Sequence, residues 1–207
     1  YLETGGTDYL HVLYAGPIAS TYRRFTLWTI GSGSNRTLSW SYGGDKGGGG
    51  LQVDDSGRVW AFRCNGTVIS GINGVEWLSS DNADPFSSGS SQGWLQRAEI
   101  GNNGWWCQPA MHGSSLMCVV ATAFTNDLKC YAWSGSAWGS TAQIAPAYPA
   151  DEFTVVEDSG GEVNAAFYIQ STLMHKRTTA VGTWGSTNNV AGSEANREPS
   201  LFADGTN

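Results

Sequence analysis

Charged residues are scarce in this sequence, and basic residues are the scarcest. Lys and Arg number 11 against 18 Asp and Glu in 207 residues, which gives a net charge of −7. Nucleic-acid binding draws on clustered Lys and Arg. We interpret the two local basic pairs, Arg23-Arg24 and Lys176-Arg177, as solvated strand or loop positions. The charge pattern therefore predicts no nucleic-acid partner.

Long apolar runs and strong helix formers are also lacking. No apolar stretch approaches the roughly 18 residues that a membrane helix needs, so we expect no membrane partner. Thr, Val, Tyr, Trp and Gly dominate instead, with 28 Gly and 10 Trp. Because β-branched and aromatic residues favour strands, the composition predicts an all-β chain.

The cysteines show no Cys-x-x-Cys spacing and no His partners at zinc-finger intervals, so we expect no metal site and no cofactor. There are four: Cys64, Cys107, Cys118 and Cys130. Cys118 and Cys130 fall on neighbouring predicted strands, so they could bridge across a hairpin, and by elimination Cys64 would pair with Cys107. Four buried thiols are the alternative.

Two glycosylation sequons begin at Asn35 and Asn65. Together with the even cysteine count and the low Lys content, they favour an extracellular or cell-surface setting. The chain opens at Tyr1 without an initiator Met, so we expect a processed form, a fragment, or a sequence read without its full gene.

One tetrapeptide occurs twice. Trp138-Gly139-Ser140-Thr141 recurs as Trp184-Gly185-Ser186-Thr187, 46 positions later. Small-residue turns precede both copies, and a repeat at an interval of 20–50 residues indicates an array of similar units.

A second sequence pattern recurs around glycines: a predicted apolar strand, a turn and another apolar strand. The turn glycines are Gly5, Gly57, Gly113, Gly160 and Gly205. Asp and Ser beside them bond to nearby backbone, and Gly takes the positive φ that tight hairpins need. The phrase divides the single domain into units at about 1–50, 51–106, 107–151 and 152–198, with 199–207 beginning a fifth.

Each unit also has a third strand, a Trp near a glycine turn and a less regular fourth strand, such as 188–191. The sequence thus predicts an all-β, β-propeller-like fold of about four four-stranded blades plus an extra C-terminal strand. A β-sandwich is the alternative, but it leaves the repeated tetrapeptide unexplained. The repeating phrase resembles the blades of sialidase-like and fucose-lectin-like propellers over nearly the whole chain.

The sialidase resemblance implies an arginine triad, a Tyr with a Glu partner and an Asp that acts as the acid. No arginine repeats at a blade-equivalent position that would form such a triad. The segment from Asp55 to Trp60 resembles the core of an Asp-box but lacks its preceding Ser or Thr, so we interpret it as a turn. We therefore expect no catalytic residues.

The fucose-lectin resemblance implies an Arg, a Glu and a Trp in each blade. Only the tryptophans are present: Trp40, Trp77, Trp138 and Trp184. They could bind a ligand by stacking on sugar faces, or they could wedge between blades as core.

We therefore expect a non-catalytic extracellular module that associates with copies of itself, as a ring or filament, through open strand edges. Leu201 and Phe202, in the unmatched final strand, are the predicted assembly residues. A carbohydrate-binding module that uses the blade tryptophans is the alternative, and a sialidase-like glycoside hydrolase is the next.

Overall fold

The structure is a computed structural model. It describes residues 2–3, 9–14, 19–26, 34–39, 49–69, 72–80, 91–94, 104–122, 127–146, 153–169, 172–191 and 199–203. All regular structure in these residues is β-strand, so the predicted all-β class is confirmed. Within the same ranges there is no helix long and apolar enough to span a membrane.

The strands in the described ranges form four antiparallel sheets, each made of consecutive strands. The first sheet contains β1 (Leu2–Glu3), β2 (Tyr9–Tyr14), β3 (Ala19–Thr26) and β4 (Ser34–Ser39). The second contains β5 (Leu51–Val53), β6 (Val59–Ile69), β7 (Ile72–Ser79) and β8 (Ser91–Trp94). The third contains β9 (Gly104–His112), β10 (Ser115–Thr122), β11 (Leu128–Trp133) and β12 (Trp138–Ala145).

The fourth sheet has an interrupted outer edge. It contains β13 (Phe153–Glu157), β14 (Val163–Ile169), β15 (Thr172–Ala180), β16 (Thr183–Trp184) and β17 (Asn188–Ala191). Both β16 and β17 pair with β15, at different points along it. Together the two short strands therefore take the place of one fourth strand.

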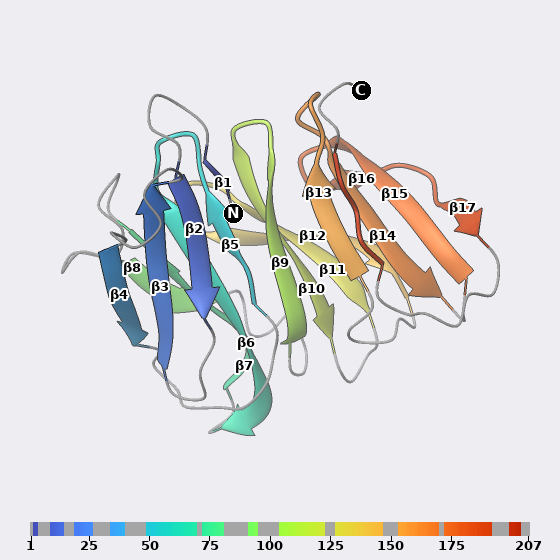
Figure 1. The fold of residues 1–207 in the computed structure, drawn as a ribbon. Coiled ribbons are helices and arrows are strands. Elements are labelled where there is room, and N and C mark those ends of the chain that lie inside the picture. The colour runs from blue at the N-terminus through green and yellow to red at the C-terminus, as the bar shows by residue number, and fades with distance from the viewer. Residues whose placement is uncertain are drawn as a thin grey trace.

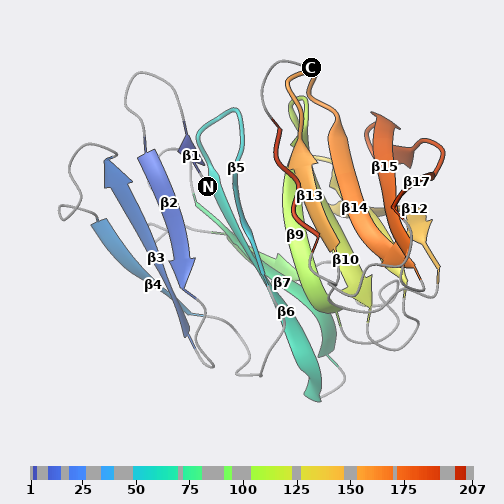
Figure 2. The ribbon, with the colours of Figure 1, turned by 45° about the vertical axis from the view of Figure 1, so that its right-hand side comes forward.

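The sheets stand side by side in chain order, from the first in blue to the fourth in orange (Figures 1 and 2). In the second, third and fourth sheets, the hairpin between the first two strands ends at the top of Figure 1. The hairpins of the third and fourth sheets touch there, because the Gly113 N–H donates to the Gly161 carbonyl at 2.9 Å.

Glycines at these hairpin turns adopt positive φ. The values are 76° at Gly57, 53° at Gly113 and 81° at Gly161, in the left-handed region that glycine tolerates best. The sequence placed the last of these at Gly160, one residue too early. The Gly161 N–H closes the turn by donating to the Asp158 carbonyl, as Gly57 does to Asp54, so the second glycine of the pair takes the bulge position.

Successive residues of β10 point alternately into two different cores. Leu116, Cys118 and Val120 pack between the second and third sheets, whereas Met117, Val119 and Ala121 pack between the third and fourth. Side chains alternate across a strand, so a strand covered on both faces needs an unbroken apolar run. That requirement explains why no polar residue interrupts residues 116–121.

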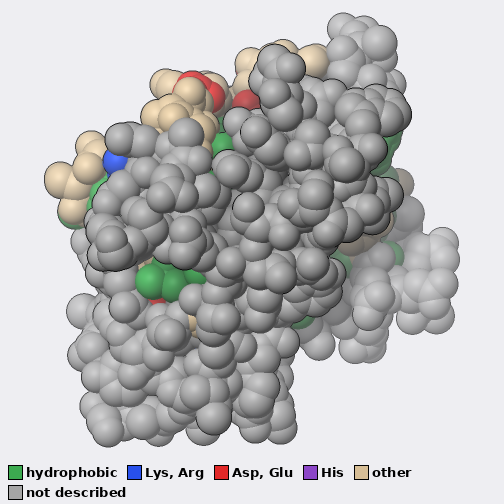
Figure 3. All heavy atoms as spheres, turned by 60° about the vertical axis from the view of Figure 1, so that its left-hand side comes forward, with side chains coloured by type: hydrophobic (Ala, Val, Ile, Leu, Met, Phe, Trp, Pro, Cys, Tyr) green, Lys and Arg blue, Asp and Glu red, His purple; other side chains and the backbone are tan. Residues whose placement is uncertain are grey.

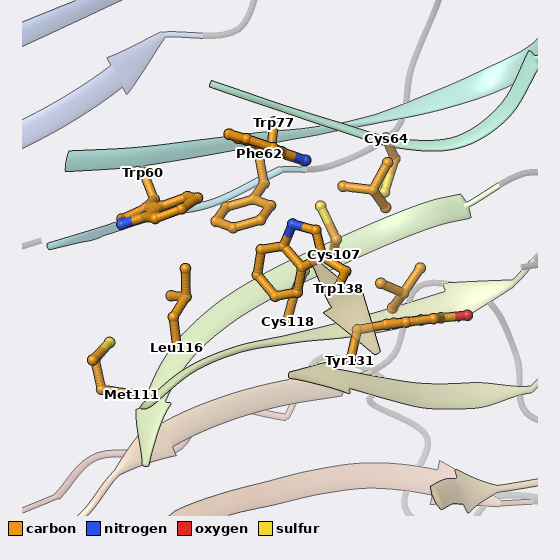
Figure 4. Packing of buried hydrophobic residues seen from close by; sticks show 12 residues of the cluster. Trp60, Phe62, Cys64, Trp77, Cys107, Met111, Leu116, Cys118, Tyr131 and Trp138 are labelled. Carbon is orange, nitrogen blue, oxygen red and sulfur yellow. The ribbon is translucent and has the colours of Figure 1, made fainter. Parts of the chain in front are cut away.

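Aromatic rings dominate the core between the second and third sheets (Figure 4). The Trp60 ring centroid lies 5.3 Å from those of Trp77 and Trp133, and Trp138 lies 5.3 Å from Trp133. Each such pair adds about 0.5–1.5 kcal/mol beyond simple burial. A smaller core that includes Leu38 and Val59 joins the first sheet to the second.

All four cysteines are buried free thiols. In the β10–β11 register, Cys118 lies opposite Tyr131 and Cys130 lies opposite Val119. A one-residue offset puts two side chains on opposite faces of a sheet. Cys118 and Cys130 accordingly occupy different cores, and the predicted bridge between them is wrong. Cys64 and Cys107 share one core.

Candidate functional site

A pocket of about 560 Å³ lies between the fourth sheet and residues 201–203. We call it the fourth-sheet pocket. Its lining residues are Val156, Asp158, Asn164, His175, Arg177, Leu201, Phe202 and Ala203. Residues 199–203, in dark red, run beside β13 without forming a strand (Figures 1 and 2).

Strand register places the polar lining residues on one face of the sheet. Asn164 on β14 lies opposite Arg177 on β15, and His175 is two residues before Arg177. The residues flanking Asn164, Val163 and Ala165, belong to the core with the third sheet. Because side chains alternate, Asn164, His175 and Arg177 face away from that core and toward the pocket.

The Asp158 carboxylate organises the hairpin at one end of the pocket. Its Oδ1 accepts the backbone N–H groups of Gly160 at 2.9 Å and Glu162 at 3.1 Å. Its Oδ2 accepts Asn164 Nδ2 at 2.9 Å and Arg177 Nη2 at 2.8 Å. Asp side chains that bond to nearby backbone in this way fix a turn, so Asp158 fixes both the turn and the two polar side chains.

These contacts set the charge state of Asp158. Burial raises the pKa of its carboxyl, but the hydrogen bonds from Asn164, Glu162 and Gly160 and the charge of Arg177 outweigh burial and lower the pKa to about 2. Asp158 is therefore a permanent anion at neutral pH.

Asn164, His175 and Arg177 form a continuous polar wall. Asn164 Oδ1 lies 2.9 Å from His175 Nε2. Burial, and then the charge of Arg177, lower the pKa of His175, so its ring is neutral at neutral pH. Arg177 also bonds Glu162 through Nη2 at 3.0 Å, while its side chain stays 51% exposed.

The second sheet contains an equivalent hairpin, fixed by Asp54. Its Oδ1 accepts the N–H groups of Ser56 and Arg58, both at 3.0 Å, and its Oδ2 accepts the Trp60 indole N–H at 2.9 Å. The partners stand two, four and six residues after the Asp, as they do after Asp158. The sequence indicated Asp55 as the first residue of a turn that resembles an Asp-box. In the structure Asp54 makes these bonds, while Asp55 is exposed.

The two sheets also share a hydroxyl contact. The Val59 N–H donates to Ser80 Oγ at 2.9 Å, and the Val163 N–H donates to Thr178 Oγ1 at 2.8 Å. These shared contacts align the two sheets residue by residue.

The alignment shows that the pocket-facing positions of the fourth sheet correspond to core positions of the second sheet. Asn164 stands at the position of Trp60, and His175 stands at the position of Trp77. Ala166, which lies opposite His175, likewise stands at the position of Phe62. In the second sheet these three aromatic residues fill the space against the third sheet. On the fourth sheet the corresponding face points away from the third sheet, and it carries these smaller and polar residues beside residues 201–203.

A smaller pocket of about 370 Å³ lies between the second and third sheets, at the hairpin tips. Asp55, Ser115 and the half-buried Trp133 are among its lining residues. Described acidic side chains also appear at the upper edge of the face drawn in Figure 3. Within the described ranges, no group of His, Cys, Asp and Glu is placed to hold a metal ion.

Two of the four predicted ligand-binding tryptophans lie in the core. Trp77 is 9% exposed and Trp138 is 3% exposed, so neither offers a free ring face to a sugar. Trp184 is partly buried against the core between the third and fourth sheets. Trp40 lies outside the described residues. Trp133, which the sequence did not single out, lines the smaller pocket.

The other predicted sites fall on strands and on the C-terminal segment. Asn35 lies on β4 and Asn65 on β6, and glycosylation at both stays a prediction. Leu201 is half-buried at the fourth-sheet pocket, whereas Phe202 is 88% exposed.

Sequence reasoning missed three pocket residues, Asn164, His175 and Arg177. The available signal was their alternation, since Asn164 interrupts an apolar strand and His175 and Arg177 are two positions apart. The sequence did not indicate which face of β14 is buried against the third sheet.

No known protein-family model matches the chain, and no curated protein matches it. Among solved structures, the chain is similar to a protein of unknown function from Dyadobacter fermentans DSM 18053. The two are 12% identical with a TM-score of 0.45, over 90% of this chain and 74% of that one.

Proposed function

We propose that the chain is a β-propeller-like module that binds a neutral glycan in the fourth-sheet pocket. Four consecutive four-stranded meanders and matching hairpin contacts in the second and fourth sheets support the repeat architecture. The predicted extracellular or cell-surface setting suits such a ligand.

One observation carries the binding proposal. The face of the fourth sheet has Asn164, Ala166 and His175 where the second sheet has three buried aromatic residues. An apolar inter-sheet interface would keep large apolar side chains there. A concave space with a few fixed polar groups is instead what small-ligand sites present, and its volume lies within their usual range of about 300–1,000 Å³.

The charges favour a neutral ligand over an anion. Asp158 and Glu162 place two negative charges around the single positive charge of Arg177, and His175 is neutral at neutral pH. A carboxylate or phosphate would meet net repulsion there, whereas hydroxyl groups would not.

The remaining hydrogen-bond donors suit hydroxyl oxygens. Within the described residues, Arg177 uses Nε and Nη2 in its contacts, which leaves the two N–H groups of Nη1 for a ligand. Asn164 has a second amide hydrogen, and the His175 ring has a second nitrogen that can donate or accept.

The opposite wall is apolar. Leu201 and Phe202 line the pocket from the C-terminal segment, whereas Val156 lies opposite Asn164 in the β13–β14 register and belongs to the sheet side. A sugar ring presents hydroxyl edges and a C–H face, so it fits between a polar wall and an exposed aromatic ring. Phe202 is the residue we assign to that stacking contact.

The site is better suited to binding than to catalysis. A glycosidase needs a carboxylic acid with a raised pKa as proton donor. Asp158, the carboxyl group among the described residues that line the pocket, has its pKa lowered to about 2 and accepts hydrogen bonds on both oxygens.

A glycan array followed by titration calorimetry tests the proposal. Neutral glycans should bind. Phe202→Ala should lower the affinity for the best ligand about tenfold, which corresponds to a loss of about 1.4 kcal/mol in binding free energy. Val190→Ala is the matched control, because Val190 is also exposed, at 59%, but lies on β17 and does not line the pocket. No bound glycan, or equal losses in both variants, would contradict the assignment.

Self-association is the second candidate, and the exposure of Phe202 favours it. An exposed aromatic residue on a segment outside every described sheet suits strand addition to another copy. Light scattering separates the two functions. Under self-association, Phe202→Asp and deletion of 199–207 should both lower the mass of the assembly, and a chain that stays monomeric at high concentration contradicts it.

A further inference from the structure

Three cysteine thiols meet in the core between the second and third sheets. Cys64 lies on β6, Cys107 on β9 and Cys118 on β10, and each is completely buried (Figure 4). Cys107 is the centre of the group, because side-chain hydrogen bonds link it to both Cys118 and Cys64. Cys130 stands apart in the other core, where its thiol lies 3.9 Å from Met117 Sδ.

The two possible bridges through Cys107 differ in geometry. Cys118 lies opposite Pro109 on β9, whereas Cys107 lies opposite Val120, so Cys107 and Cys118 are diagonal neighbours. Diagonal Cβ atoms lie roughly 7 Å apart, whereas a disulfide needs about 3.5–4.5 Å. A bridge between them would distort the β9–β10 ladder.

Cys64 and Cys107 face each other across the sheet interface instead. Their strands, β6 and β9, are the ones that approach most closely between the two sheets. The backbone is tight there, since a Cβ added at Gly50 would collide with the Pro109 ring, two residues from Cys107. This close approach brings an inter-sheet pair within reach of a bridge without a register change.

We propose that Cys64 and Cys107 form the single disulfide of the oxidised protein, which links the second sheet to the third while Cys118 and Cys130 remain thiols. The oxidant is a disulfide-bearing molecule such as oxidised glutathione. One thiolate of the pair attacks one sulfur of that disulfide, and the first thiol leaves. The other thiolate of the pair then attacks the protein sulfur of the mixed disulfide and releases the second thiol.

The chemistry balances without another reactant. The protein loses two S–H bonds and gains one S–S bond, and the two electrons reduce the oxidant to two thiols. In the folded chain, burial opposes ionisation of Cys107, but its hydrogen bonds with Cys118 and Cys64 outweigh burial and lower its pKa, while burial raises the pKa of Cys64 and Cys118. Complete burial of the three thiols keeps the oxidant out of the folded core, so the exchange takes place during folding, and either thiolate of the pair can attack first.

Refolding in a glutathione redox mixture tests this pairing. After alkylation without reduction, mass spectrometry should show a chain with two alkyl groups instead of four. Its peptide map should contain one cross-linked pair, which joins Cys64 to Cys107. Cys118 and Cys130 should carry alkyl groups. The bridge should raise the melting temperature by about 5–15 °C over the reduced protein.

Cys118→Ser is the matched control for Cys64→Ser, since both thiols are buried in the same core and bond to Cys107. Cys118→Ser should keep the bridge, and Cys64→Ser should abolish it. A link from Cys107 to Cys118, a link from Cys118 to Cys130, or four alkylated thiols in the wild type would overturn the proposal. The wild-type map decides the pairing even where a variant fails to fold.

Discussion

Replacing Trp138 and Trp184 by Ala should give unequal losses of stability, although the two residues open identical tetrapeptides. Trp138 is 3% exposed, and its ring lies 5.6 Å from Phe62 and 5.3 Å from Trp133. Trp184 is only partly buried at the edge of the other core. Burial, not local sequence, therefore sets the cost of each truncation.

For Trp138→Ala we expect a loss of about 3–5 kcal/mol in the free energy of unfolding, typical of truncating a buried Trp to Ala. That loss corresponds to a drop of roughly 6–20 °C in melting temperature for a chain of this size. For Trp184→Ala we expect about 1–3 kcal/mol, because part of the ring already contacts water.

Urea unfolding followed by circular dichroism measures both losses, with Trp138→Phe as a third variant. Phe keeps an aromatic ring against Phe62 and Trp133, so it should recover part of the loss. Equal losses at the two tryptophans, or a loss under about 1 kcal/mol for Trp138→Ala, would refute the packing account.

Two further predictions concern the hairpins. Asp158→Asn should reduce stability by about 1–3 kcal/mol at pH 7. Because the folded pKa of about 2 lies below the ordinary 3.8, the contribution of the wild-type carboxylate is complete above about pH 4 and fades toward pH 2. The stability gap between wild type and variant should therefore narrow over that range, and a gap that is constant with pH contradicts the role of the charge. Gly161→Ala should destabilise more than Gly57→Ala by differential scanning calorimetry. Both have positive φ, but only at Gly161 would the new Cβ crowd the Gly113 nitrogen, at 3.3 Å. Equal melting temperatures in these two variants would mean that the contact between the hairpin tips adds nothing.

Much of the strand order could be predicted because the strands and turns carry local signals. Alternating or continuous apolar runs on either side of Gly57 and Gly113 mark hairpins, and both glycines have the positive φ that the pattern predicts. The fourth strand predicted at 188–191 is β17. The Asp-box-like pattern also predicted a turn at this place, although the carboxylate that bonds the turn is Asp54, one residue before the predicted Asp55.

What the sequence could not supply is the facing of each strand. A one-residue offset separates Cys118 from Cys130, and strand propensity does not report such an offset. The fourth-sheet pocket depends on the same information. Asn164, His175 and Phe202 come from three segments, and only the register of β14 on β15 and the course of 199–203 bring them together.

The most direct test of the binding proposal is the NMR response of the Asn164 side-chain amide and the Arg177 Nε–H to a neutral glycan. Both groups line the fourth-sheet pocket, and both give resolvable side-chain signals. We predict that these two signals shift in a saturable way, while the indole N–H of Trp133, beside the other pocket, stays in place. Saturable shifts at Trp133 with none at Asn164 and Arg177, or no shifts at any glycan concentration, would contradict the proposal.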